Sequence, residues 1–157
     1  GADPEPAVET DLPTLLHELA AGASPQRVHV RATSQQVKLL APSSALRRVL
    51  GNLLDNALRY GGDQPVELVS ELAETGVRIG VLDRGPGIAP DQMSAVFQPF
   101  HRVEPSRNPD TGGIGLGLAI VRQLADIHGW QIDISARADR GLAAWLTIPM
   151  MRAVPRQ

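Results

Sequence analysis

The 157-residue chain contains no cysteine, which excludes a disulfide framework, a thiolate zinc site and a cysteine nucleophile, and which fits a reducing compartment. Its single lysine, Lys38, does not belong to the Gly-x-x-x-x-Gly-Lys pattern of a phosphate-binding P-loop. No apolar run reaches the roughly 18–20 residues that a membrane-spanning helix needs, and no signal-peptide pattern is visible. We therefore expect the chain as given to be soluble.

An excess of one charge is also lacking, since 15 basic and 17 acidic residues give a net charge of −2. Such a balance provides no general attraction to nucleic acid or to an anionic membrane, and we expect no nucleic-acid partner. The chain does have 43 % hydrophobic residues in a length typical of one domain. That content is enough for a single hydrophobic core.

The hydrophobic pattern predicts helices and strands in mixed order, without strict βαβ alternation. This order favours an α+β sandwich in which helices cover one face of a mixed sheet. The expected helices cover residues 12–20 with Asp11 as cap, residues 43–60 with Ser43 or Ser44 as cap, and Gly115–His128. The expected strands are Val28–Thr33, Val37–Leu40, Val66–Leu72, Val77–Leu82, Gln131–Ala136 and Leu142–Pro149, the first two forming a hairpin.

The two ends of the chain carry no periodic pattern. Residues 1–10 are rich in proline and acidic residues and are expected to be a linker, and residues 151–157 a tail. The domain itself is expected to cover residues 11–150. Its last helix is expected to turn one face inward, composed of Leu116, Ala119, Ile120, Gln123, Leu124 and Ile127.

The helix expected at residues 43–60 carries the most informative pattern. At about 100° per residue it places six apolar side chains on one arc, Leu46, Val49, Leu50, Leu53, Leu54 and Ala57. At the edge of that arc, Asn52, Asn56 and Arg59 lie together, with Tyr60 one step nearer the core. Amide oxygens beside a cation suit a metal ion and phosphate oxygens.

Two glycine-rich segments, residues 83–88 and 112–118, flank a long proline-rich connection. The second opens directly into a helix, so its free backbone amides and the positive end of the helix dipole favour an anion. Asp83 ends an apolar strand and could accept a hydrogen bond from an exocyclic amine. Each segment alone is also typical of an ordinary turn, and paired asparagines of an ordinary surface; it is their occurrence together, in this order, that favours a site.

Taken together, four sequence boxes resemble the catalytic and ATP-binding domain of bacterial sensor histidine kinases, in the GHKL or Bergerat-fold ATPase superfamily. The resemblance covers about Asp11 to Pro149. The boxes are Asn52–Gly61, Asp83–Ile88, Phe97–Arg102 and Gly113–Ile120. It implies a mixed sheet of about five strands with three main helices on one face, and an ATP lid over residues 84–112.

The resemblance also implies roles for individual residues toward ATP and Mg²⁺. Asn56 would coordinate Mg²⁺, with Asn52 as a possible second support for the metal or phosphates. Arg59 would contact phosphate and Tyr60 would pack on the adenine or ribose. Asp83 would accept a hydrogen bond from the adenine amino group.

Further nucleotide-lining residues follow from the glycine-rich boxes and the lid. They are Gly85, Gly87, Ile88, Gly113, Gly115, Leu116, Gly117 and Leu118, of which Gly87 leaves room for the base. Arg102 on the lid would approach the γ-phosphate or the partner helix. The catalytic set implied by the resemblance is Asn56, Arg59 and Arg102.

The implied function is transfer of the γ-phosphate of ATP to a histidine in two-component signalling. That histidine would belong to a separate dimerisation domain of the full-length sensor, which would pass the phosphate to a response regulator. His17-Glu18 matches only the first two positions of a phosphoacceptor box, so His17 is interpreted as a helix-surface residue. The isolated domain is expected to be a monomer and cytoplasmic, within a sensor anchored in the bacterial cell membrane.

Two departures keep alternatives open. The last glycine box of the family is altered here to Gly141-Leu142-Ala143-Ala144-Trp145, which leaves room for a scaffold that has lost nucleotide. Asn52 stands where hydrolysing relatives carry a glutamate that activates water. The second alternative is an anti-sigma-type serine kinase or another nucleotide-binding regulatory module of the same fold, and it is disfavoured because such kinases usually keep that glutamate.

Overall fold

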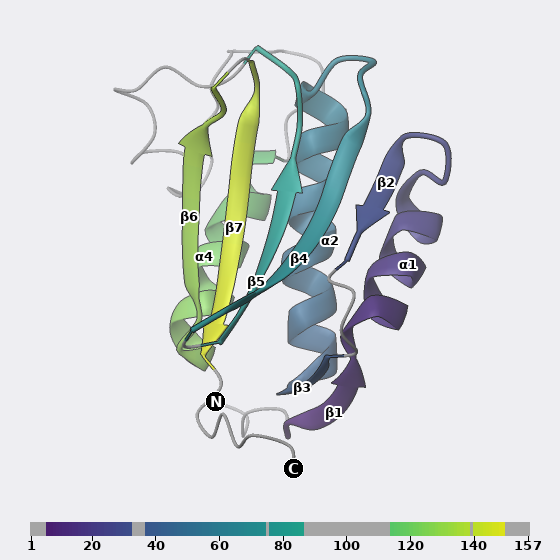
Figure 1. The fold of residues 1–157 in the computed structure, drawn as a ribbon. Coiled ribbons are helices and arrows are strands. Elements are labelled where there is room, and N and C mark those ends of the chain that lie inside the picture. The colour runs from purple at the N-terminus through teal and green to yellow at the C-terminus, as the bar shows by residue number, and fades with distance from the viewer. Residues whose placement is uncertain (1–5, 33–36, 75, 87–113, 139, 150–157) are drawn as a thin grey trace.

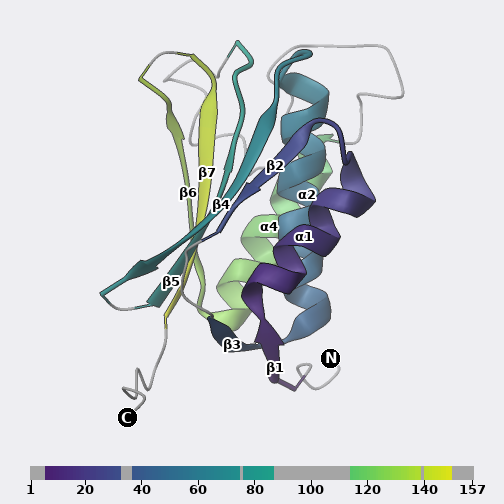
Figure 2. The same cartoon turned by 45° about the vertical axis from the view of Figure 1, so that its right-hand side comes forward.

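The computed structural model describes residues 6–32, 37–74, 76–86, 114–138 and 140–149. They form two layers, with a five-stranded sheet on one side and helices α1, α2 and α4 covering one of its faces (Figures 1 and 2). The helices are α1 (Leu12–Ala23), α2 (Ser43–Tyr60) and α4 (Ile114–His128). None of these described helices is both long and apolar enough to cross a bilayer.

The sheet has the strand order β2-β4-β5-β7-β6. β2 runs parallel to β4, and every other neighbouring pair is antiparallel, so the sheet is mixed. The predicted α+β class and the number of strands in this sheet are confirmed. Its strands are β2 (Val28–Arg31), β4 (Val66–Ala73), β5 (Gly76–Leu82), β6 (Gln131–Ala136) and β7 (Leu142–Pro149).

The predicted hairpin between the first two strands is wrong. β2 pairs with β4, whereas β3 (Lys38–Ala41) pairs with β1 (Val8–Asp11) in a separate two-stranded sheet at the base of the molecule (Figure 1). Residues 8–10 are therefore strand and not linker. Local periodicity identifies a strand but not its partner, and the polar β1 has no alternation that would have marked it.

Helix α2 buries the apolar arc that its sequence predicts: Leu46, Val49, Leu50, Leu53, Leu54 and Ala57 are all at most 4 % exposed. Its cap differs from the prediction, because Pro42 is the N-cap and makes no side-chain hydrogen bond. For α1, Asp11 is the predicted cap and accepts a hydrogen bond from the Thr14 amide at 3.3 Å.

Helix α4 buries a different set of residues from the one predicted, although the predicted Leu124 is half-buried and packs against the core. Leu118, Val121 and Ala125 are buried, whereas Ile127 is 61 % exposed and Gln123 also faces solvent. Both faces satisfy helical spacing, since the first half of this helix is apolar nearly all round. Packing against α2 and β6 selects between them.

The C-terminal end of α2 is held by a side chain from another part of the chain. Arg27, just before β2, donates from Nη1 to the Leu58 carbonyl at 3.2 Å and from Nη2 to the Gln64 carbonyl at 3.3 Å and to the Gly62 carbonyl. A cation at this end also opposes the negative pole of the helix dipole. The position of the last turn of α2 is thereby fixed relative to the sheet.

Candidate functional site

Asp83 follows the last residue of β5 and is 8 % exposed. Its Oδ1 accepts two backbone hydrogen bonds, from the Gly85 amide at 2.8 Å and from the Leu142 amide at 3.2 Å. The Asp83 amide in turn donates to the Leu142 carbonyl at 2.9 Å. Both donors bind the same oxygen, so they fix the orientation of the carboxylate while leaving Oδ2 out of these two bonds.

Three glycines allow backbone segments to pack around Asp83. A Cβ built on Gly61, just after α2, would lie 3.1 Å from the Asp83 Cβ and 2.4 Å from the Ala57 carbonyl oxygen. A Cβ on Gly85 would lie 2.2 Å from the Tyr60 carbonyl oxygen. Gly141, with φ of +100°, approaches the Asp83 carbonyl so closely that a Cβ would lie 2.1 Å from it. The turn after β5 is therefore wedged between the end of α2 and the β6–β7 turn.

Replacing Gly85 by Ala should destabilise the domain. The new methyl group would overlap the Tyr60 carbonyl, which is backbone at a helix end and cannot rotate away. We expect the free energy of unfolding to fall by about 1–3 kcal/mol, measured by urea denaturation. Gly51→Ala is the matched control: Gly51 lies inside α2, and apart from the helix's own nearby backbone no described atom lies within 4 Å of its new Cβ, so this change should stabilise by about 0.5–1 kcal/mol. Equal stability of the two variants would contradict the tight packing at Gly85.

The face of α2 next to this turn carries the predicted polar residues. Asn56 is half-buried, and its amide nitrogen Nδ2 is fully buried without a hydrogen-bond partner among the described residues. Arg59 is exposed, and its Nε pairs with Asp55 at 3.1 Å across one helical turn. Asn52 and Tyr60 are half-buried and make contacts of their own. An unpaired buried N–H donor costs about 1–3 kcal/mol, and a hydrogen-bond acceptor such as a phosphate oxygen would satisfy it.

The N-terminal end of α4 lies at the same end of the sheet as the C-terminal ends of α2 and of β5, the strand that Asp83 follows (Figure 1). Gly115, Leu116 and Gly117 fall in the first turn of α4, where backbone amides have no partner within the helix. The Leu118 side chain is 9 % exposed and packs in the core, so only its backbone could face a ligand. The predicted site residues Gly87, Ile88, Arg102 and Gly113 lie outside the described residues.

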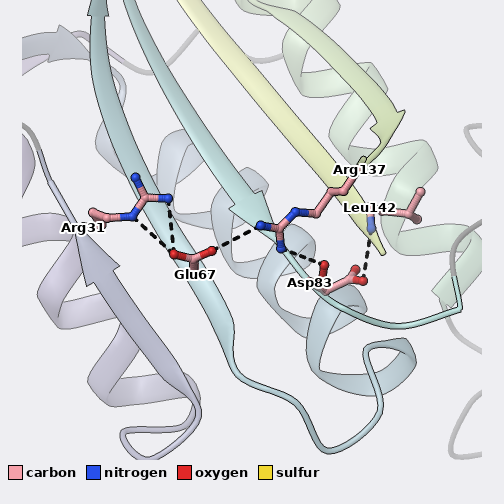
Figure 3. A network of polar contacts seen from close by, with 5 residues as sticks. All are labelled: Arg31, Glu67, Asp83, Arg137 and Leu142. Carbon is pink, nitrogen blue, oxygen red and sulfur yellow. Dashed lines mark hydrogen bonds and ion pairs between the residues drawn. The ribbon is translucent and has the colours of Figure 1, made fainter. Parts of the chain in front are cut away.

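Two arginines that the sequence did not predict also contact this turn. Arg137 donates from Nη1 to the Asp83 carbonyl at 3.0 Å (Figure 3), and Arg140 donates from Nε to the Gly85 carbonyl at 3.1 Å. Both lie between β6 and β7, about 55 residues away along the chain. Their spacing matches no motif, so the sequence offered no signal for them.

Comparison with known proteins identifies the family to which this domain is similar. Residues 41–152 match the model of the histidine kinase-, DNA gyrase B- and HSP90-like ATPase family. Sensor protein RstB of Escherichia coli K12 is 34 % identical over 97 % of this chain and 35 % of its own length. The crystal structure of full-length ShkA in complex with AMPPNP superposes with a TM-score of 0.77 at 28 % identity, covering 96 % of this chain and 33 % of that one. The histidine kinase domain of the E. coli osmosensor EnvZ gives a TM-score of 0.69 at 29 % identity, covering 100 % of this chain and 98 % of that one.

The fold and the buried carboxylate beside an amide-bearing helix thus define a class, an ATPase module built as a mixed sheet covered by helices. The chain belongs to the histidine kinase-, DNA gyrase B- and HSP90-like ATPase family. Within it, the chain is the catalytic ATPase domain of the kind found in sensor histidine kinases. It spans about a third of the length of RstB.

Proposed function

We propose that this domain binds ATP with Mg²⁺ and presents the γ-phosphate to a histidine on a separate dimerisation domain. The observation that carries the proposal is the oriented, buried carboxylate of Asp83 next to the end of α2, the helix that carries the unpaired amide nitrogen of Asn56. Asp83 Oδ2, which takes no part in the two backbone hydrogen bonds, would accept a hydrogen bond from the exocyclic amine of adenine. The complex of ShkA with AMPPNP, an ATP analogue, supports a nucleotide of this kind.

The residues present fit a magnesium ion. The carboxamide oxygen of Asn56 is a ligand type that Mg²⁺ accepts alongside phosphate oxygens, and its buried nitrogen, which has no described partner, would donate to a phosphate oxygen. Asn52, one helical turn earlier on α2, would support the metal or the phosphates. Bound there, Mg²⁺ would neutralise charge on the phosphates during transfer.

Other residues of the chain would hold the rest of the nucleotide. Arg59 would turn from Asp55 to the phosphates, and this exchange is easy because both side chains are largely exposed and a surface ion pair contributes only about 0–1 kcal/mol. The first turn of α4 would direct backbone amides at the phosphates. Tyr60 would pack on the adenine or ribose. The role of Arg102 stays a prediction from the sequence.

Asn52 favours transfer to a partner over hydrolysis. An amide cannot act as a general base for water at neutral pH, whereas the glutamate expected of hydrolysing relatives could. The acceptor histidine would come from the rest of the sensor, because His17-Glu18 matches only the first two positions of a phosphoacceptor box. The complete protein would be anchored in the membrane with this domain in the cytoplasm, and a response regulator would receive the phosphate.

This proposal predicts that the isolated chain binds ATP in the presence of Mg²⁺ but does not label itself. Binding is measured by calorimetry, and labelling by incubation with radiolabelled γ-phosphate ATP. Adding a histidine-bearing dimerisation domain should produce an acid-labile phosphohistidine on that domain.

Robust self-labelling of the chain would contradict transfer to a separate domain, and an acid-stable phosphoserine on a protein partner would instead support the serine-kinase alternative. A chain whose thermal stability does not respond to ADP with Mg²⁺ would be a scaffold that has lost nucleotide.

A further inference from the structure

The β6–β7 turn forms several hydrogen bonds with the turn that contains Asp83. Arg137 binds the Asp83 carbonyl at 3.0 Å, Arg140 binds the Gly85 carbonyl at 3.1 Å, and the Leu142 amide binds Asp83 Oδ1 at 3.2 Å. The turn itself is closed by the Arg137 amide, which donates to the Gly141 carbonyl at 3.0 Å. The Asp83 carbonyl, the Gly85 carbonyl and the Asp83 side chain are therefore all held by one neighbouring turn.

Arg137 is itself oriented by a second residue, Glu67 on β4 (Figure 3). Glu67 Oε1 lies 3.4 Å from Arg137 Nη2, and its Oε2 lies 3.2 Å from Arg31 on β2. Glu67 is the register partner of Leu82, the residue before Asp83. The Arg137 side chain is 18 % exposed, against 61 % for Arg31, so Arg137 is the enclosed member of this group.

The two ends of the Arg137 guanidinium thus have different partners. One nitrogen is held by a carboxylate on the sheet, and the other holds the peptide carbonyl of Asp83. A peptide plane fixed at its carbonyl restricts the backbone dihedrals of its residue, and these set the direction of the side chain. Charge-assisted bonds of this kind are stronger than neutral ones.

We propose that Arg137 is a positioning residue for the base-reading carboxylate of Asp83, and that it sets the preference for a 6-aminopurine nucleotide. The inference rests on the proposed function, in which Asp83 reads adenine. The β6–β7 turn would hold that carboxylate in the one direction from which it can accept a hydrogen bond from the amine. Arg137 does not touch the nucleotide.

The test compares ATP with inosine triphosphate, which carries a carbonyl oxygen in place of the adenine amine. Both are titrated by calorimetry in the presence of Mg²⁺. Wild type should prefer ATP. Arg137→Met keeps the length of the side chain but removes its donors, and we expect it to weaken ATP binding about tenfold while changing binding of inosine triphosphate less than about twofold. Arg137→Lys keeps one donor and should recover part of the preference.

Arg78→Met is the matched control. Arg78 pairs with Glu71 at 2.6 Å, four residues along β4 from Glu67, and stacks on the Trp145 ring, but it makes no described contact with Asp83. This variant should keep the wild-type preference. If Arg137→Met does not fold, as judged by circular dichroism, Glu67→Gln provides the same measurement, with an expected loss for ATP of about threefold.

The outcomes distinguish a failure of the positioning role of Arg137 from a failure of the proposed function. A purely structural role of Arg137 would weaken both nucleotides equally, and an unchanged ratio in Arg137→Met overturns the positioning role while leaving the proposed function standing. If wild type binds neither nucleotide, or binds both equally, the reading of adenine by Asp83 is wrong and the positioning role falls with it. A ratio lowered in Arg137→Met and in Asp83→Asn, but not in Arg78→Met, supports both.

Discussion

Replacing Asp83 by Asn is expected to weaken ATP binding about 100-fold and to reverse the preference for the base. The Gly85 and Leu142 amides both need an acceptor where Oδ1 now lies, so the oxygen of the new side chain should take that place. Its NH₂ group would then occupy the position of Oδ2 and meet the adenine amine, donor against donor. Loss of a charge-assisted bond and a mispaired buried donor together are worth about 3 kcal/mol, which corresponds to about 100-fold.

The same geometry predicts what the variant should gain. Inosine triphosphate offers a carbonyl oxygen at this position, and the side-chain NH₂ group introduced by Asp83→Asn would be its donor. Calorimetric titration of both nucleotides measures the reversal directly, and thermal unfolding checks that the nearly isosteric change leaves the fold intact. Wild-type affinity for ATP in this variant would show that Asp83 does not read the base.

Replacing Asn56 by Ala should separate function from stability. The change removes a buried amide nitrogen that has no described partner and introduces a better helix former into α2. We therefore expect the free chain to keep its stability or to gain up to about 0.5 kcal/mol. Binding of ATP in Mg²⁺ should nevertheless fall by about 10- to 100-fold, because the metal would lose its protein ligand.

The dependence on the metal is the sharper readout for Asn56. Wild type should bind ATP more tightly with Mg²⁺ than with EDTA, and Asn56→Ala should lose most of that difference. Arg48→Ala is a suitable control, because Arg48 is exposed two turns before Asn56 on the same helix and is not among the residues proposed to hold the nucleotide or the metal. A clear loss of stability in Asn56→Ala, with the Mg²⁺ dependence unchanged, would assign Asn56 to the structure of α2 and not to a ligand.

Asn56 and Asp83 also show which features of the site the sequence alone predicts. The sequence alone singles out both Asn56 and Asp83, the first from the edge of a helical arc and the second from its place at a strand end. The structure adds that Asp83 is oriented by two amides on one oxygen and that the Asn56 amide nitrogen has no described partner. Residue type and position predicted which groups matter, but not which of their atoms are already engaged.

The sequence by itself determined the features that repeat locally or lie within one short segment. They include the buried arc of α2, the Asp11 cap of α1, the limits of most strands and the boxes that mark the family. Each depends on residues within a few positions of one another, where helical or strand periodicity links spacing to orientation.

Only the tertiary structure decided the features that join distant segments. It paired β2 with β4 and β1 with β3, chose the inward face of α4, and brought Arg137 from the β6–β7 turn to the backbone of Asp83. Such contacts form because the sheet, once assembled, places β4, β5 and β7 side by side. No local period encodes which distant strand will be the neighbour, so these residues acquire their roles only through packing.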